Sequence, residues 1–408
     1  MPPDFLNRSY VGLENFIDNY IHKYKGKKTV VVTNHSGLDF QLNKNIDLLR
    51  KNGLEIVFLL VPEHGLFGYQ NEYDKKDYNV QDNINAVVYN LHKLNENSLR
   101  ALLKVTDIVI YDIQDMGMRC YTYISSLKFI MDTLKGSDIE LIVLDRPNPI
   151  GFLGVDGAYL ERRFYSRHIS AFPAPFIYCM TIGEAALYYK GEYVRDLNLT
   201  VVPILYYNRL MLYNETMLPW TPPSPNLPTY ESSVLYSAVV LLEGINISLG
   251  RGTTKPFEYI GAPWIEPLKF CKGLKSLGLD NFRFRPIYFK PTFSKYSDER
   301  CGGVQIFYVG GKFSPTEVSY RLTRYIMAAY NECKWEKYKN YYDIDYLAGT
   351  DRFRKSIEEG SSYSRYLKEI KGGISWYKRI REKYLIYHPK FDSILFPDEI
   401  FDNISMNL

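Results

Sequence analysis

Residues 56–68 read IVFLLVPEHGLFG, a continuous apolar run followed by a polar turn that contains glycine. An apolar run of this length is typical of a strand that is buried on both faces of a parallel sheet. Pro62 cannot donate a hydrogen bond to a neighbouring strand, so we expect the strand to end there. Glu63 and His64 would then lie just beyond its carboxyl end, which is where ligands bind in open α/β sheets.

Three other apolar runs, at residues 29–32, 107–111 and 141–144, are also followed by polar side chains. The polar residues that follow them are Asn34, His35, Asp112, Asp115, Asp145, Arg146 and Asn148. The carboxyl ends of parallel strands meet at one edge of a sheet, so we expect these side chains to lie near Glu63. The sequence therefore predicts an active site at this edge.

Strands and helices alternate through the first half of the chain. Apolar residues at helical spacing predict helices at residues 11–24, 41–52, 84–104 and 122–135, and residues 69–82 are predicted to form a surface loop. Such alternation predicts an α/β fold with a Rossmann-like parallel sheet. No G-x-G-x-x-G follows the first strand, so a bound dinucleotide is not indicated.

The proline-rich segment PWTPPSPNLP at residues 219–228 marks the predicted domain boundary, because proline disfavours helix interiors and central strands. We expect a catalytic domain at residues 1–228, a smaller α+β domain at 229–408, and the active cleft between them. A further strand is predicted at 199–205, before the boundary. In the second domain, helices are predicted at 232–242, from Ser314 onward and at 363–384, and strands at 282–293 and 303–309.

Composition narrows the class of protein. A net charge of +4 over 408 residues, without a dense stripe of Lys and Arg, argues against a nucleic-acid partner. Five scattered cysteines without a CxxC pair argue against a disulfide framework or a zinc ribbon. No apolar run approaches a membrane span, so we expect no membrane partner and a cytoplasmic protein, or an exported one if a signal peptide has been removed.

Glu63 is the first candidate for a catalytic acid, because a carboxyl group beside His64 at a strand end could deliver a proton. The alternative is that Glu63 only orders the turn. Asp112 and Asp115, with Arg119 and Tyr121 nearby, suit a polar, hydroxylated ligand, and one aspartate could act as a base or stabilise charge. Alternatively, Asp115 caps the following helix and Arg119 pairs with an acid.

Further binding candidates lie beyond these strands. Arg146 could bind a carboxylate in bidentate fashion or tie down its own loop through Asp145. The glycine-rich loop at residues 243–261 and the segment before it provide plausible substrate contacts, although a structural turn is an equal alternative. These second-domain and boundary candidates are Asn226, Glu243, Asn246 and Arg251.

A divalent metal site is a further alternative. His35, His64, Glu63 and the two aspartates have the right ligand types, but no HxH or HExxH spacing appears. We therefore expect no metal and no other cofactor. Thr181 and Glu184 have the spacing of a helix capping box, so a structural role is expected for Glu184.

Together these stretches resemble one family, the exo-β-N-acetylmuramidases, formerly a domain of unknown function. The resemblance runs in order over about residues 28–310. Its motifs are TNHSG (33–37), PEHG (62–65), YDIQD (111–115), YTYI (121–124), LDRPNP (144–149), MTIGE (180–184), PSPNLP (223–228), LEG (242–244), GRGT (250–253), PW (263–264) and GGVQ (302–305).

The resemblance implies a Rossmann-like domain, a smaller second domain and hydrolysis that releases N-acetylmuramic acid, or a related amino sugar, from the non-reducing end of peptidoglycan fragments. It favours Glu63 as a catalytic residue. The second carboxylate would be Asp115, Asp112 or Glu243, and the sugar would be held by Asn34, His35, Arg119, Arg146 and Arg251. A muropeptide or amino-sugar glycoside would be the small-molecule substrate.

The sequence departs from the family pattern at Phe67, where an arginine is usual, at Tyr178 and Cys179, where a His-Gly pair is usual, and across residues 74–92. Because an arginine and a histidine are natural partners for the lactyl carboxylate, these departures bear on which sugar is bound. Two other functions stay open at this point: a sugar-binding protein without turnover, and a metal-dependent hydrolase.

Overall fold

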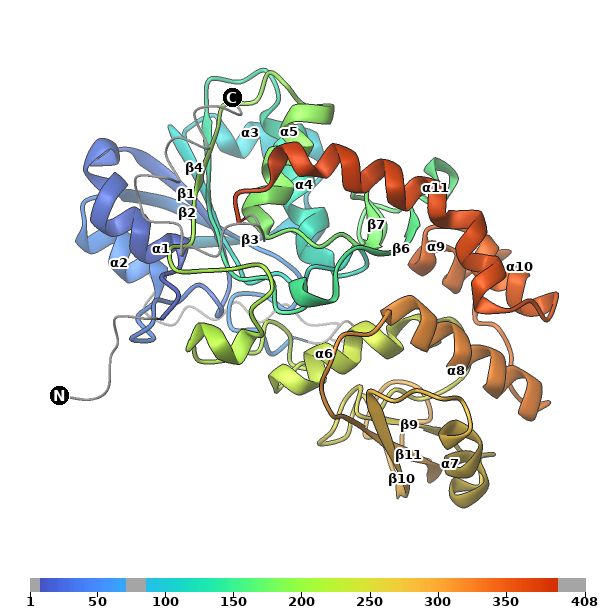
Figure 1. Ribbon diagram of the computed structural model, residues 1–408. Helices are drawn as coiled ribbons and strands as arrows, with labels where there is room; N and C mark the ends of the chain where they lie inside the picture. The colour runs from blue at the N-terminus through green and yellow to red at the C-terminus, as the bar shows by residue number, and fades with distance from the viewer. Residues whose placement is uncertain (1–7, 71–85, 388–408) are drawn as a thin grey trace.

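The computed structural model describes residues 8–70 and 86–387 (Figure 1). Its first domain contains a six-stranded, all-parallel sheet in the order β3-β2-β1-β4-β5-β8. The strands are β1 (Lys28–Thr33), β2 (Glu55–Val61), β3 (Val87–Asn90), β4 (Ile108–Asp112), β5 (Glu140–Leu144) and β8 (Leu199–Val202). The predicted α/β fold class and parallel sheet are confirmed.

Helices cover both faces of this sheet. Along β1, Val31 packs in one core with the N-terminal helices, whereas Val30 and Val32 pack in the core on the other face, as the two-residue period of a strand requires. On the first face lie α1 (Gly12–Asn15), the short helices Phe16–Tyr20 and Ile21–Tyr24, and α2 (Asn45–Lys51). On the second lie α3 (Glu96–Leu103), α4 (Thr122–Leu134) and α5 (Ile182–Tyr193).

The helix predicted at residues 84–104 is wrong in its first half. Residues 87–90 form β3, which pairs with β2 at the edge of the sheet, and α3 begins only after Asn95. The Asn95 side chain accepts a hydrogen bond from the backbone of Ser98 and so fixes the helix start. Residues 71–85, which include most of the predicted surface loop, lie outside the described part of the chain.

The second domain is built around an antiparallel sheet of β9 (Tyr259–Ala262), β10 (Phe282–Phe289) and β11 (Cys301–Tyr308) in the order β10-β11-β9. Helices α6 (Tyr230–Val239) and α8 (Pro315–Ala329) lie between this sheet and the first domain, and α7 (Pro267–Lys275) covers it from outside (Figure 1). As predicted, α8 has Ser314 as its N-cap and Pro at its first position.

Smaller elements complete the chain. They are the hairpins β6 (Asp156–Tyr159) with β7 (Pro175–Ile177) and β12 (Lys337–Tyr338) with β13 (Tyr341–Tyr342), helices α9 (Asp343–Ala348) and α10 (Arg352–Glu358), and the short helices Leu91–Lys93, Gly151–Leu153, Arg162–Phe164, Tyr213–Thr216, Val240–Gly244 and Glu382–Tyr384. No helix within residues 8–70 and 86–387 has the length and apolar character to cross a membrane.

The last helix, α11 (Tyr363–Arg381), returns to the first domain and packs beside β6 and β7 (Figure 1). The segment after it is anchored by buried polar groups. Tyr387 donates its hydroxyl to Asp145 Oδ2 at 2.8 Å and its backbone N–H to Glu184 Oε1 at 3.1 Å. Arg209 pairs with the same Glu184, with N–O distances of 2.5 and 2.9 Å. The capping box of Thr181 and Glu184 is confirmed.

Candidate active site

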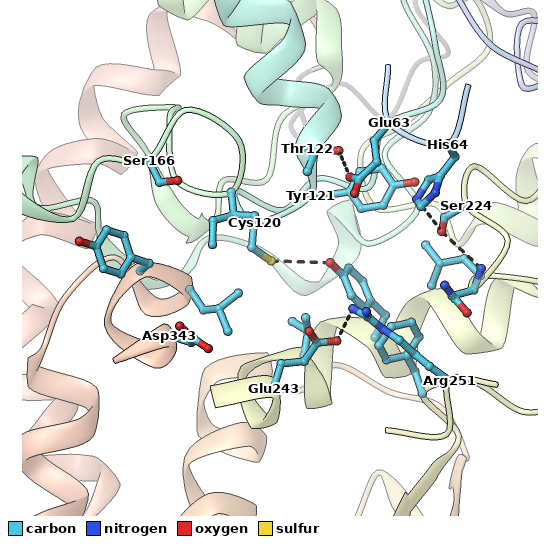
Figure 2. A pocket seen from close by; sticks show the side chains of 18 of the residues that line it. Glu63, His64, Cys120, Tyr121, Thr122, Ser166, Ser224, Glu243, Arg251 and Asp343 are labelled. Carbon is cyan, nitrogen blue, oxygen red and sulfur yellow. Dashed lines mark hydrogen bonds and ion pairs between the residues drawn. The ribbon is translucent and has the colours of Figure 1, made fainter. Parts of the chain in front are cut away.

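A pocket of about 480 Å³ lies between the carboxyl edge of the parallel sheet and the second domain (Figure 2). Residues of both domains line it. The polar lining residues are Glu63, His64, Cys120, Thr122, Ser166, Ser224, Asn226, Glu243, Arg251 and Asp343, and the aromatic ones are Tyr121, Tyr236, Phe257, Phe293, Tyr338, Tyr341 and Tyr346. Its size suits a small, polar organic ligand.

Glu63 stands in the turn that follows β2, as the sequence predicts. Its Oε2 accepts a hydrogen bond of 2.8 Å from the hydroxyl of Thr122, the first residue of α4. Thr122 therefore fixes the orientation of the carboxyl group at the pocket wall (Figure 2).

His64 lies beside Glu63 with a positive φ of 73°, a backbone conformation that is uncommon outside glycine. Its Nδ1 lies 2.7 Å from the carbonyl oxygen of Gln70, so in the neutral ring this nitrogen carries the proton. The Nε2 atom then accepts from the hydroxyl of Ser224 at 3.2 Å. These bonds fix the ring beside the catalytic candidate.

The opposite wall comes from the second domain (Figure 2). Glu243 and Arg251 form an ion pair with an N–O distance of 2.5 Å. Asp343, at the start of α9, is a third acid of the pocket, and burial together with the nearby Glu336 raises the pKa of its carboxyl group. The described lining thus holds three carboxyl groups and one guanidinium.

The floor between the walls is mostly uncharged. The Tyr236 hydroxyl lies 3.8 Å from the sulfur of Cys120. Burial raises the pKa of the Cys120 thiol to about 12, so this thiol is protonated at neutral pH and is a poor nucleophile.

Two stacked histidines lie behind Glu63. The rings of His92 and His168 are 4.5 Å apart at an interplanar angle of 14°. Burial lowers the pKa of His92 to about 4 and also lowers that of His168, against the opposing effect of the Glu63 carboxylate. His92 is therefore neutral at pH 7 and provides no positive charge beside Glu63.

Six of the predicted site residues line this pocket. They are Glu63, His64, Tyr121, Asn226, Glu243 and Arg251. The other eight lie outside the lining.

Asp112, at the end of β4, and Arg146, just after β5, pair with each other at the carboxyl edge of the sheet. The Arg146 Nε lies 2.6 Å from Asp112 Oδ1, and Asn45 donates to Oδ2 at 2.7 Å. Asp112 is fully buried. Arg146 thus binds an internal carboxylate, although its partner is Asp112 and not the predicted Asp145.

Asp115 and Arg119 are buried outside the pocket lining, and Arg119 contacts α9 of the second domain. Asp115 accepts from the backbone of Gly117 at 2.7 Å and from the Tyr178 hydroxyl, and burial raises its pKa to about 6. Arg119 donates to Ser170 and to a backbone carbonyl, and burial lowers its pKa to about 10. The predicted capping of α4 by Asp115 is wrong, since that helix has no side-chain cap.

The remaining predicted residues stabilise loops. Asn34 accepts from Ser36 and donates to Tyr123, and the His35 ring contacts the carbonyl of Pro222. Asn148 donates to the carbonyl of Met180 at 2.8 Å. Asn246 bonds the backbone at residues 332 and 334.

Several pocket residues were missed by the sequence analysis. Thr122 directly follows Tyr121 and Ser224 lies two residues before Asn226, so the motifs that contain these two predicted residues were the available signal. Asp343, Tyr338 and Tyr341 come from a part of the chain without a recognised motif, and only the folded chain brings them to the pocket. Within the described ranges, no group of three or more His, Cys, Asp or Glu side chains could hold a metal ion.

The fold and the pocket define a two-domain α/β protein with an acid-bearing pocket between its domains. Two family models match the chain: the N-terminal part of exo-β-N-acetylmuramidase NamZ at residues 29–231 and its C-terminal part at residues 234–387. The chain belongs to the exo-β-N-acetylmuramidase NamZ family.

Individual relatives agree with this assignment. The chain is 36% identical over 378 residues to the peptidoglycan β-N-acetylmuramidase NamZ of Bacillus subtilis, covering 92% of this chain and 91% of the relative. Two crystal structures of DUF1343 family proteins from Bacteroides fragilis are similar, each at 30% identity. Their TM-scores are 0.83 and 0.70, over 94% and 93% of this chain and 100% and 99% of theirs.

Phe67, Tyr178 and Cys179, which depart from the family pattern, lie outside the described pocket lining, and residues 74–85 of the divergent segment lie outside the described part of the chain. Tyr178 and Cys179 are buried in the first domain, where the Tyr178 hydroxyl bonds Asp115. Phe67 packs near Lys44, whose ammonium lies 5.7 Å from the ring centre. The described pocket lining contains the acids Glu63, Glu243 and Asp343 and the arginine Arg251, and none of the three positions that depart from the pattern.

Proposed function

We propose that this protein is an exo-acting glycoside hydrolase that releases N-acetylmuramic acid from the non-reducing end of peptidoglycan fragments. The observation that carries the proposal is the position of Glu63, which stands at the carboxyl end of β2 on the wall of the pocket between the domains. The full-length similarity to a peptidoglycan β-N-acetylmuramidase supports the same reaction.

Glu63 is the proposed proton donor to the leaving glycosidic oxygen. Thr122 donates to Oε2, so the transferable proton resides on the other carboxyl oxygen. Glu243 is the proposed second carboxylate, which stabilises the oxocarbenium-like transition state or activates water. It faces Glu63 across the pocket, while Asp112 and Asp115 are engaged inside the first domain (Figure 2).

Arg251 is the proposed receptor for the lactyl carboxylate of N-acetylmuramic acid. It is the single arginine or lysine of the described lining, and a guanidinium can bind two carboxylates through its several N–H donors. Glu243 holds the guanidinium at the pocket wall before substrate binds. A sugar without the lactyl group would lack this ion pair.

We further propose that the two domains divide this work. Residues 1–228 would supply the acid Glu63 and the histidine beside it, and residues 229–408 would supply Glu243 and Arg251. The meeting of the two family models between residues 231 and 234 supports a boundary in this region.

Chromophore release from N-acetylmuramic acid and N-acetylglucosamine glycosides tests the proposal, with the parent protein and Glu63→Gln run in parallel. Release from the muramic glycoside alone, abolished by Glu63→Gln, is the expected result. Release from the N-acetylglucosamine glycoside alone would keep the hydrolase and overturn the sugar. Binding of the muramic glycoside without turnover would leave a sugar-binding protein.

A further inference from the structure

The tyrosines that line the pocket are buried on its floor and exposed at its rim. Tyr121 and Tyr236, on the floor, are each 7% exposed, whereas Tyr338 and Tyr341 line the same pocket and are 67% and 58% exposed. Large exposed aromatic side chains beside a pocket are typical of binding surfaces. The two tyrosines therefore lie where a ligand longer than the pocket would leave it.

The β12–β13 hairpin fixes both rings on one side. Tyr338 and Tyr341 are direct cross-strand partners, so their side chains point to the same face of the hairpin. Tyr341 also packs edge-to-face on Tyr346 of α9, with ring centres 6.0 Å apart, and Tyr346 lines the pocket as well. The chain thus builds a continuous aromatic surface from the rim toward the interior.

A lysine lies beside this surface. The ammonium of Lys339 lies 5.4 Å from the ring centre of Tyr338, whereas Lys337 and Tyr342 pair with each other on the opposite face of the hairpin. The rim therefore combines aromatic faces with positive charge, which suits a sugar that continues into a chain carrying carboxylates.

We propose that Tyr338 and Tyr341 form a subsite for the sugar on the leaving side of the cleaved bond, the next N-acetylated sugar of the glycan. This inference rests on the proposed function, because an exo-acting enzyme holds the terminal sugar on the floor and the remaining chain must pass the rim. The C–H groups on a sugar face carry partial positive charge and pack on the electron-rich face of an aromatic ring.

Two substrates that differ only on the leaving side test the subsite: the β-1,4-linked disaccharide of N-acetylmuramic acid and N-acetylglucosamine, and the methyl β-glycoside of N-acetylmuramic acid. Released N-acetylmuramic acid is quantified by chromatography. In the double variant Tyr338→Ala/Tyr341→Ala, kcat/KM for the disaccharide should fall about tenfold, equivalent to about 1.4 kcal/mol, while that for the methyl glycoside stays within about twofold.

Two controls separate stacking from folding. The double variant with Phe at both positions keeps the rings and should retain activity on the disaccharide. Tyr288→Ala removes a tyrosine that is 62% exposed in the second domain and outside the pocket lining, and should affect neither substrate.

The outcomes distinguish the two proposals. An equal loss on both substrates, or no loss on either, in a parent protein that hydrolyses both would overturn the subsite alone. If the parent protein hydrolyses neither substrate, the proposed function falls and the subsite falls with it.

Discussion

The hydrogen bond between Thr122 and Glu63 gives a quantitative prediction for catalysis. Thr122→Val keeps the branched shape at the first position of α4 and removes the 2.8 Å bond to Oε2. A hydrogen bond to a carboxyl group contributes about 1–2 kcal/mol when, as for Glu63, the group is only partly buried. That energy corresponds to a loss of about 5- to 30-fold in kcat.

The assay is initial-rate hydrolysis of the muramic glycoside at saturating substrate, with unfolding followed in urea to confirm the native state. Thr122→Ser retains the hydroxyl and should keep most of the rate. Thr133→Val removes a hydroxyl that bonds the Phe129 carbonyl on the same helix outside the pocket lining, and should leave kcat unchanged. A Thr122→Val enzyme within twofold of the parent would refute the role assigned to this bond.

Three more changes test other groups. Arg251→Met should lower kcat/KM for the muramic glycoside about 10- to 100-fold, whereas Arg251→Lys, which keeps a positive charge, should lose less; equal losses in the two variants would contradict carboxylate recognition. Burial raises the pKa of Asp115 from 3.8 to about 6, so between these values the folded state holds more protons and its stability falls as pH rises. The free energy of unfolding of Asp115→Asn in urea, relative to that of the parent, should therefore rise by on the order of 3 kcal/mol from pH 4 to pH 7. A difference between the two proteins that does not change with pH would exclude this titration. Arg209→Met leaves the buried Glu184 without its cation and should lower the free energy of unfolding in urea by about 3–5 kcal/mol. Arg321→Met, at an exposed ion pair, should lower it by less than about 1 kcal/mol, and similar losses would refute the distinction between buried and exposed pairs.

The sheet was predictable because buried parallel strands leave long apolar runs. The sequence of β2 shows both the strand and its end, since Pro62 follows it directly, and Glu63 therefore comes to the sheet edge by local geometry alone. The edge strand β3 was missed because four residues with exposed Val87 and Val88 carry too little pattern to be told from a helix.

The partners of the edge residues were not predictable in the same way. Asp112 ends β4 and Arg146 follows β5, and nothing in the sequence shows that these two residues pair with each other and leave the pocket to Glu63. Asp343 and Tyr338 reach the pocket through packing between segments that are hundreds of residues apart from β2. Local patterns locate a strand end, but only tertiary contacts decide which charges stay available.

The return of α11 and of Tyr387 to the first domain bears on how the pocket can open. A domain that is joined to another by one segment can rotate in any direction about that attachment. Here the peptide chain joins the two domains both before α6 and through α11, so any rotation is confined to the line through both attachments. The two attachments thus restrict any opening of the pocket to rotation of the domains about one axis.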